Sequence, residues 1–256
     1  MRLLAVHTLN SARIAGIHSL VSDCRQAEGL SLSFPFTDAD LYVLLQENGQ
    51  ILSAAAFTDM GSVFECSAFT HPSVRRRGYF SRLLKAALPR LPKGTELLFY
   101  TNAACLDAQK TLSALGARKA PDEYFMELSL KDFQPESFPD HSPSAPCQEP
   151  FQPDKREESG IFTYQAFCGS VQIAVYPDWY YLYGLEIHEP FRGQGLGRAL
   201  LFFVLSDLKD KNPLPLRLQV SGDNLPALSL YEKTGFRITE TLSCYLYQPS
   251  VLIKLQ

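Results

Sequence analysis

Residues Glu189–Leu200 read EPFRGQGLGRAL, with three glycines at alternate positions and an arginine on either side of them. The chain before this segment alternates like a β-strand, and the chain after it has the apolar spacing of an α-helix. Glycines in such a turn allow positive φ, so several N–H groups can point at one spot beside the positively polarised helix start. A tight connection without a ligand is the alternative. The pattern predicts a diphosphate cradle made of Arg192, Gly193, Gln194, Gly195, Gly197 and Arg198.

The glycine spacing differs from two familiar nucleotide-binding motifs. Arg198 occupies the place of the third glycine in G-x-G-x-x-G, and the turn has no P-loop Lys-Ser or Lys-Thr pair. The turn instead resembles the acetyl-CoA-binding turn of the GNAT acetyltransferase superfamily, because Arg192–Gly197 matches the pattern Arg/Gln-x-x-Gly-x-Gly/Ala. Asn224–Phe236, read NLPALSLYEKTGF, looks like that family's second motif, N-x-x-A-x-x-x-Y-x-x-x-G-F. The two motifs in this order identify the chain as similar to GNAT acetyltransferases.

The resemblance implies acetyl-CoA as cosubstrate and suggests roles around its thioester. Tyr231 is the candidate acid for the departing CoA thiolate, and the alternative is a tyrosine that only packs against the pantetheine or the core. Asn224 is expected to cap its helix or to bind the pantetheine arm. The backbone near Leu185 and Ile187 is expected to pair with pantetheine amides and to polarise the acetyl carbonyl.

Glu186 is the candidate general base, acting directly or through a water molecule. Strict strand alternation places it opposite Leu185 and Ile187, unless Gly184 marks a β-bulge that changes the parity. A solvated or structural glutamate is the alternative. Three aromatic side chains of this strand region would line an acceptor pocket or pack in the core: Trp179, Tyr181 and Tyr183.

The chain repeats one order of elements twice, which predicts duplication of an α/β unit. The expected strands and helices of the first half are Leu41–Gln46, Ile51–Phe57, Val63–Thr70, a helix over Tyr79–Leu91, and Glu96–Thr101. Those of the second half are Ile161–Phe167, Val171–Tyr176, Tyr180–His188, a helix from Leu196, and Leu216–Ser221. Gly116 follows Gly78 by 38 residues and Gly235 follows Gly195 by 40, although chance similarity of two α/β halves stays open.

A proline-rich segment separates the halves. Residues 132–154 carry six prolines among polar side chains, and proline cannot donate to a ladder or a helix interior. We therefore expect domains at residues 1–131 and 155–256 with a linker at 132–154. The alternative is a long surface loop within one domain.

The two expected units are not equivalent. In the first, Phe80 stands where the family has a small residue, Leu112 takes the place of Tyr231, and Asn102 is out of register, so this copy is expected to be degenerate and non-catalytic. The second has little room before Ile161 for the first strand and the first two helices of the usual family unit. Residues 9–27 are expected to supply such helices to the first unit. We expect an α/β protein with two GNAT-like mixed-sheet units in tandem, the second truncated at its start.

Composition excludes several other classes. The net charge of -3 and the pI near 6.0 disfavour a nucleic-acid partner, because counterion release needs clustered basic residues. The six cysteines stand singly, which disfavours a zinc site, and we expect buried thiols in a reducing cytoplasm. No apolar run is long enough for a signal peptide or a membrane span. No metal and no membrane partner are expected, and the oligomeric state stays undetermined.

The predicted function is transfer of an acetyl group from acetyl-CoA to a primary amine of a small molecule or peptide. The alternative is an acyl-CoA-binding sensor or structural module without turnover. Acceptor identity depends on loops and pocket shape, which motif spacing does not encode.

Overall fold

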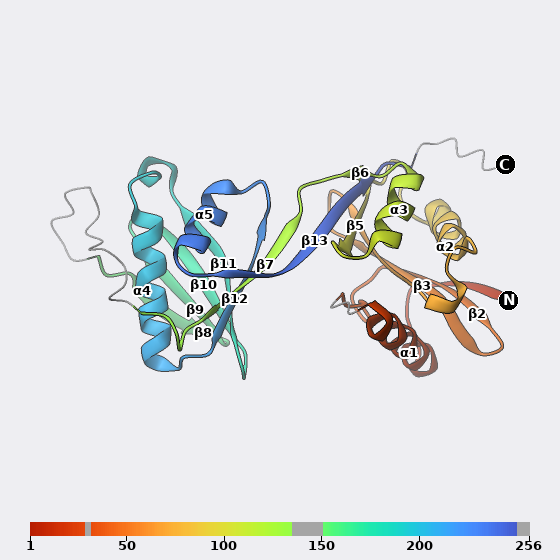
Figure 1. Cartoon of the computed structure of the whole chain (residues 1–256), viewed down its shortest axis with the longest axis horizontal. Helices are drawn as coiled ribbons and strands as arrows, with labels where there is room; N and C mark the ends of the chain where they lie inside the picture. Colours follow the sequence, from red (N-terminus) through yellow and green to blue (C-terminus); the bar gives the residue numbers. More distant parts are fainter. Residues whose placement is uncertain (29–31, 135–150, 250–256) are drawn as a thin grey trace. The chain divides into compact units, whose positions relative to one another are not determined.

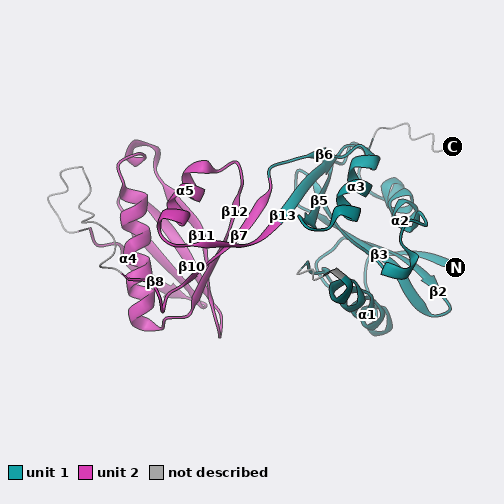
Figure 2. Cartoon of the chain, in the orientation of Figure 1, with its two compact units in different colours: residues 1–121, 242–256 teal, residues 122–241 magenta. Residues whose placement is uncertain are grey.

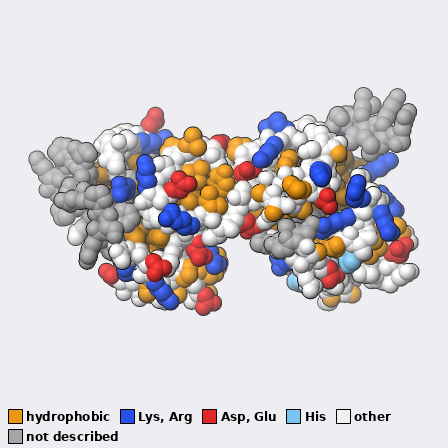
Figure 3. Space-filling view, in the orientation of Figure 1, with side chains coloured by type: hydrophobic (Ala, Val, Ile, Leu, Met, Phe, Trp, Pro, Cys, Tyr) orange, Lys and Arg blue, Asp and Glu red, His pale blue; other side chains and the backbone are white. Residues whose placement is uncertain are grey.

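The computed structural model describes residues 1–28, 32–134 and 151–249 (Figure 1). Within these residues the chain forms two compact units, residues 1–121 with 242–256 and residues 122–241 (Figure 2). None of the described helices is long and apolar enough to cross a membrane. In Figure 3, acidic and basic side chains are interspersed over the visible face of both units.

Unit 1 is a mixed sheet with helices on both faces. Its strand order is β1-β2-β3-β4-β5-β13, and every neighbouring pair is antiparallel except β4 and β5. The strands are β1 (Arg2–Val6), β2 (Leu41–Glu47), β3 (Gln50–Asp59), β4 (Phe64–Thr70), β5 (Leu97–Asn102) and β13 (Arg237–Tyr247), with the short β6 (Arg118–Lys119) beside β13. The helices are α1 (Ser11–Glu28), α2 (Tyr79–Ala87) and α3 (Leu106–Leu115).

The apolar pattern of unit 1 explains its two layers of helices. Residues 41–45 of β2 are all buried, because α1 covers one face of the sheet and α2 and α3 cover the other (Figure 1). The predicted stripe of α2 is confirmed, since Tyr79, Leu83, Leu84 and Ala87 are buried. The α-helix ends at Ala87 rather than Leu91, and a 3₁₀ turn with Pro89 follows it.

Unit 2 is a second mixed sheet with helices on one face. Its order is β7-β12-β11-β10-β9-β8, where only β11 and β12 are parallel. The strands are β7 (Glu123–Ser129), β8 (Asp154–Glu158), β9 (Ile161–Ala166), β10 (Gly169–Val175), β11 (Tyr180–Ile187) and β12 (Pro215–Ser221). Helices α4 (Leu196–Lys211) and α5 (Leu225–Lys233) both pack into one apolar cluster.

The predicted truncation of the second unit is correct for the helices and wrong for the first strand. Only Ser159 and Gly160, both with positive φ, separate β8 from β9, so no helix corresponds to α1 there. The strand β8 does exist, and it pairs with β9 as β1 pairs with β2.

The unit boundaries differ from the predicted ranges because each sheet is completed by a strand from the other half of the sequence. β7 follows α3 but pairs with β12 over Glu123–Ser129. Residues 242–247 of β13 follow unit 2 but pair with β5 in unit 1. Such pairing is set by contacts far apart in sequence, so residues 1–131 and 155–256 are each missing a strand.

Most of the predicted linker, residues 135–150, lies outside the described residues. Its described ends belong to unit 2. Phe133 is buried and lies edge-on to Phe202 of α4, with ring centroids 5.8 Å apart. Phe151 also packs partly against the cluster of unit 2.

Candidate functional site

The glycine turn of unit 2 has the backbone conformation that the sequence predicts. Gly193 and Gly195 have φ of 73° and 79°, and Gly195 is the residue that precedes α4. Two side chains hold the turn in place: Arg192 Nε donates to the carbonyl of Ile187 at 2.8 Å, and Gln194 Nε2 donates to that of Pro190 at 2.9 Å. Both bonds tie the turn to the chain just before it, and neither uses a backbone N–H group of the turn.

The start of α4 leaves backbone donors available. The first bonds back to the turn are those of Arg198 and Ala199, whose N–H groups both donate to the Gly195 carbonyl at 3.1 Å. The earlier N–H groups of a helix have no carbonyl one turn back, and they lie at its positive end. Apart from the glycine and its two chain neighbours, no heavy atom of the described residues lies within 4 Å of an ideal Cβ at Gly193 or Gly195. The space beside the turn is therefore open to an anion.

Gly197 has a different physical role. An ideal Cβ at this position would lie 3.3 Å from Cγ1 of Ile187, which is tighter than ordinary van der Waals contact. The glycine therefore lets α4 approach β11 closely. This packing brings the helix start next to the end of the strand.

Strands β11 and β12 separate beside the turn. They pair in parallel only at Tyr180 with Leu216 and at Tyr181 with Arg217. Beyond Tyr181, the edge of β11 that faces β12 has no strand partner among the residues the structure describes. Its N–H and C=O groups can therefore pair with an extended amide-containing ligand.

β11 contains the bulge that Gly184 was expected to mark. Gly184 has φ of 62°, and the register between β10 and β11 shifts between Ser170 and Gln172. Tyr180 in β11 and Phe64 in β4 are corresponding residues, because each is the first residue paired with the neighbouring parallel strand, and they lie 116 residues apart in sequence. The corresponding turn glycines, Gly195 and Gly78, lie 117 residues apart. One extra residue has thus been inserted into β11 relative to β4.

The bulge sorts the side chains of β11 onto two faces. Leu185 and Ile187 pack against the same apolar cluster as Tyr180 and Leu182, on the side of α4 and α5. Glu186 is exposed and points to the opposite side. The bulge lies before Leu185, so it leaves Glu186 opposite Leu185 and Ile187, contrary to the parity change considered from the sequence; its effect is to place Glu186 on the face of Tyr181 and Tyr183.

Gly169 is a residue that the sequence reasoning missed. An ideal Cβ there would lie 2.0 Å from the carbonyl oxygen of Glu186, so only glycine permits this approach of β10 to the bulged strand. Its signal was available in sequence only as an isolated glycine at a strand start, which has no distinctive spacing.

Tyr231 and Asn224 both lie in or beside α5. Tyr231 is 6% exposed, its ring lies 5.5 Å from that of Phe236, and burial raises the pKa of its phenol to about 12. Asn224 caps the helix by accepting a hydrogen bond from the N–H of Ala227 at 3.3 Å, which confirms the predicted cap.

The aromatic side chains near the start of β11 form a stacked group. Tyr176 stacks on Trp179 with centroids 4.1 Å apart, and the guanidinium of Arg217 lies 5.0 Å from the Trp179 ring. The rings of Tyr181 and Tyr183 also stack, with centroids 6.3 Å apart, and both side chains are half-buried. The group lies on the face of the sheet away from α4 and α5, so it is not part of the main core.

Unit 1 has the same turn, and its parallel strands β4 and β5 also pair at only two positions, but it lacks the bulge and the tyrosine. Gly78 has φ of 72° before α2, and Arg75 Nε donates to the carbonyl of Thr70 at 3.1 Å, as Arg192 does to Ile187. However, β3 and β4 pair without a register shift, so β4 has no bulge. Leu112, in the position of Tyr231, is buried in the apolar cluster.

Metal-binding groups are scarce in the described parts of the chain. There, no three histidine, cysteine, aspartate or glutamate side chains lie close enough together to hold a metal ion. Cys66 and Cys168 are buried. The pKa of the Cys66 thiol is raised, mainly by burial and to a lesser extent by the negative charge of Glu65. Cys147 lies outside the described residues.

Comparison with known proteins gives a consistent result. The model of the Acetyltransferase (GNAT) family matches residues 123–236, nearly the range of unit 2. Ribosomal protein bS18-alanine N-acetyltransferase of Escherichia coli (strain K12) is 36% identical over 55 residues, 22% of this chain, and the chain spans only 37% of that relative's length. Mycothiol acetyltransferase of Saccharomonospora viridis is 37% identical over 60 residues, 23% of this chain and 20% of the relative.

A solved structure extends the likeness to almost the whole chain. A tandem GNAT protein from the clavulanic acid biosynthesis pathway aligns with a TM-score of 0.68 at 16% identity. The alignment covers 97% of this chain and 100% of the other. At this identity the likeness concerns the fold, and it confirms two units of one kind in tandem.

Proposed function

Because the chain belongs to the GNAT acetyltransferase superfamily, we propose that unit 2 transfers the acetyl group of acetyl-CoA to a primary amine of a small molecule or peptide. The observation that carries the proposal is the combination of the glycine turn, the bulged strand and Tyr231 in one unit. Unit 1 has only the first of these. One of the relatives is named for transfer to alanine nitrogen, which supports an amine as acceptor.

The proposed cofactor site follows from the free backbone groups. The N–H groups at the start of α4 would bind the diphosphate, and Arg192 and Arg198 would supply positive charge. The unpaired edge of β11, around Leu185 and Ile187, would pair with the pantetheine amides. Asn224, besides its cap, would bind the same arm.

Two side chains would handle protons during aminolysis. The amine must be neutral to attack the thioester carbon, and the thiolate that leaves must gain a proton. Tyr231 keeps its proton at neutral pH because of its raised pKa, so it is available to donate a hydrogen bond or a proton to the sulfur. Glu186 is exposed, so we propose that it accepts the amine proton through water rather than by direct contact.

An acyl-CoA sensor is the competing function, and the exposure of Glu186 is the observation that favours it. A solvated carboxylate positions a proton acceptor less firmly than a desolvated one. A sensor would bind acetyl-CoA and release no thiol.

The test combines binding with turnover. Acetyl-CoA affinity is measured by calorimetry, and CoA thiol release is followed with a panel of primary amines, for the parent, Tyr231→Phe and Tyr247→Phe. Tyr247 is the matched control, because it is a 5% exposed tyrosine in unit 1 whose pKa burial also raises.

We expect Tyr231→Phe to lower turnover by roughly 10²-fold with little change in acetyl-CoA affinity. Tyr247→Phe should behave like the parent. Binding without thiol release above the buffer rate for every amine would favour the sensor. A Tyr231→Phe rate within about twofold of the parent would remove the acid role.

A further inference from the structure

Gly169, the first residue of β10, lies against the part of β11 that we assign to the cofactor. An ideal Cβ on Gly169 would lie 2.0 Å from the carbonyl oxygen of Glu186, 2.9 Å from its carbonyl carbon and 3.0 Å from Cα of Ile187. These are backbone atoms of a paired strand, which cannot turn aside as the end of a flexible side chain can. A side chain at position 169 therefore requires the peptide unit between Glu186 and Ile187 to move.

The start of β10 is itself held from two sides. Gly169 is paired with β11 on one side and with β9 on the other. The side-chain amide of Gln165 donates to the Gly169 carbonyl at 3.3 Å, and the His188 N–H donates to the carbonyl of the fully buried Cys168 at 2.8 Å. β10 therefore has little freedom to retreat, and β11 is the strand that a new side chain would displace.

The position of the Glu186 carbonyl determines the direction of the next N–H group. In a planar trans peptide the carbonyl and the following N–H point in opposite directions. The Glu186 carbonyl points towards Gly169 of β10, so the Ile187 N–H points away from β10. It therefore faces the edge of β11 that has no strand partner beyond Tyr181 in the described residues, where we propose that acetyl-CoA pairs.

Unit 1 has a side chain at the corresponding position. Ser53 of β3 and its partner Thr70 lie 116 and 117 residues before Gly169 and its partner in β11, the same offsets as on the two sides of the bulge. The Ser53 hydroxyl donates to the carbonyl of Phe69, the counterpart of Glu186, at 3.2 Å. In unit 1 this carbonyl thus lies against a side chain rather than against the bare Cα of the neighbouring strand.

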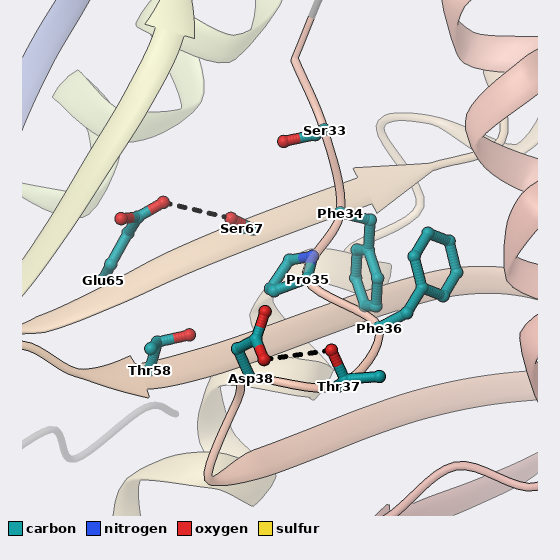
Figure 4. Close-up of a pocket in the computed structure, with 9 residues that line it drawn as sticks. All are labelled: Ser33, Phe34, Pro35, Phe36, Thr37, Asp38, Thr58, Glu65 and Ser67. Atoms are coloured by element: carbon teal, nitrogen blue, oxygen red, sulfur yellow. Dashed lines mark hydrogen bonds between the residues drawn. The ribbon is translucent and has the colours of Figure 1, made fainter. Parts of the chain in front are cut away.

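β4 also keeps a regular alternation where β11 does not. Glu65 and Ser67 project from one side of β4 into the pocket that Figure 4 shows, and Phe69 continues the alternation in the cluster beneath α1. In β11 the corresponding series is broken after Tyr183, because Glu186, three residues later, is next on that face. The bulge and the close glycine contact therefore occur together, in unit 2.

From these contacts we propose that Gly169 is a positioning residue of the transferase, which holds the peptide unit of Glu186 so that the Ile187 N–H faces the cofactor. Gly169 does not touch acetyl-CoA and acts only through β11. This inference rests on the proposed function of unit 2, because it requires β11 to pair with the pantetheine arm. A glycine that served packing alone would affect the stability of the unit and not its preference among ligands.

The experiment compares two ligands that share the diphosphate. Acetyl-CoA and adenosine 3′-phosphate 5′-diphosphate, which lacks the pantetheine arm, are titrated by calorimetry into the full chain, with thermal unfolding recorded on the same samples. The variants are Gly169→Ser, which introduces the residue of unit 1, and Ser53→Gly, the matched control at the corresponding position. Ser53 is buried and its hydroxyl is hydrogen-bonded to Phe69 and Thr70, so the control should also lose stability.

We expect Gly169→Ser to weaken acetyl-CoA binding about tenfold, as for loss of one hydrogen bond to β11, and to change the affinity for the nucleotide by less than about twofold. Ser53→Gly should lower Tm and leave both affinities unchanged. The positioning role is refuted if a folded Gly169→Ser chain binds acetyl-CoA like the parent, or loses affinity for both ligands equally. A parent chain that does not bind acetyl-CoA would refute the proposed function of unit 2 instead.

A second measurement needs no variant. In the parent chain, amide exchange resolved by NMR should be fast for Ile187 without ligand, slowed by acetyl-CoA and unaffected by the nucleotide. The His188 amide, which donates to β10, is the internal control and should be protected throughout. An Ile187 amide that is already protected in the free chain, or that stays unprotected with acetyl-CoA bound, would overturn the proposal even if Gly169→Ser does not fold.

Discussion

Replacing Gly195 by alanine separates the backbone cost of the turn from its role in binding, because Gly78 provides a matched position. Both glycines precede a helix and have positive φ, 79° at Gly195 and 72° at Gly78. In the part of the chain that the structure describes, neither has a heavy atom within 4 Å of an ideal Cβ apart from its own chain neighbours. An L-residue in this left-handed region costs about 1–2 kcal/mol. Gly195→Ala and Gly78→Ala should therefore lose similar stability, visible as a fall of a few degrees in Tm.

The two variants should differ in acetyl-CoA affinity. At position 195 the new Cβ would stand in the open space that we assign to the diphosphate and would displace it from the N–H groups. Losing a charge-assisted hydrogen bond costs about 1.5–3 kcal/mol, which raises Kd by about 10- to 100-fold. Gly78→Ala should leave Kd within about twofold, since unit 1 lacks the bulge that completes the site.

The assay is calorimetric titration of acetyl-CoA into the parent and both variants, with thermal unfolding recorded on the same samples. Equal stability loss with unequal affinity is the expected outcome. The reasoning is refuted if Gly78→Ala weakens binding as much as Gly195→Ala, or if Gly195→Ala binds like the parent despite its lower Tm.

Three further predictions concern pH, a network and the strand exchange. Because burial raises the pKa of Tyr231 to about 12, this group keeps its proton below that value, so turnover corrected for thioester hydrolysis should show no Tyr231-dependent fall below about pH 11; a fall near pH 9 that Tyr231→Phe abolishes would contradict this. Burial tends to raise the pKa of Asp207, but hydrogen bonds from Lys155 and Tyr164 and nearby positive charge outweigh it, so the net pKa is lowered and Asp207 stabilises the fold above its unfolded pKa near 4. Urea unfolding should therefore show Asp207→Asn less stable by about 1 kcal/mol at pH 7, with the difference shrinking progressively as the pH falls below about 4 towards the lowered folded-state pKa, and a difference as large at pH 3 as at pH 7 would count against the ionic origin. A chain of residues 122–241 contains every strand of unit 2 and should fold and bind acetyl-CoA, whereas residues 155–256 lack β7 and should aggregate; circular dichroism and gel filtration decide, and a folded 155–256 monomer would disprove the need for β7.

Local chemistry made much of the site predictable from sequence. Glycines between a strand and a helix restrict the backbone strongly, so the turn at Gly193 and Gly195 was confirmed in position and conformation. Gly184 was similarly informative, because a lone glycine inside an apolar strand is a frequent mark of a bulge. The cap by Asn224 required only a polar side chain at a helix start.

The features that sequence did not predict depend on distant contacts. The sequences of β7 and β13 do not indicate which sheet each strand joins, since a strand has the same alternation of apolar and polar residues in either sheet. β8 reads DKREE and is exposed along its whole length, so it lacks the apolar alternation that marks a strand. It is held instead by pairing with β9 and by the contact of Lys155 with Asp207.

The central claim is that one acetyl-CoA molecule binds the chain, and that it binds in unit 2. Hydrogen–deuterium exchange of the full chain with and without saturating acetyl-CoA tests this claim at the level of individual segments. The account predicts slower exchange on binding at residues 193–199 and 182–187, with no change at residues 76–82. Protection at residues 76–82 without protection at residues 193–199 would contradict it.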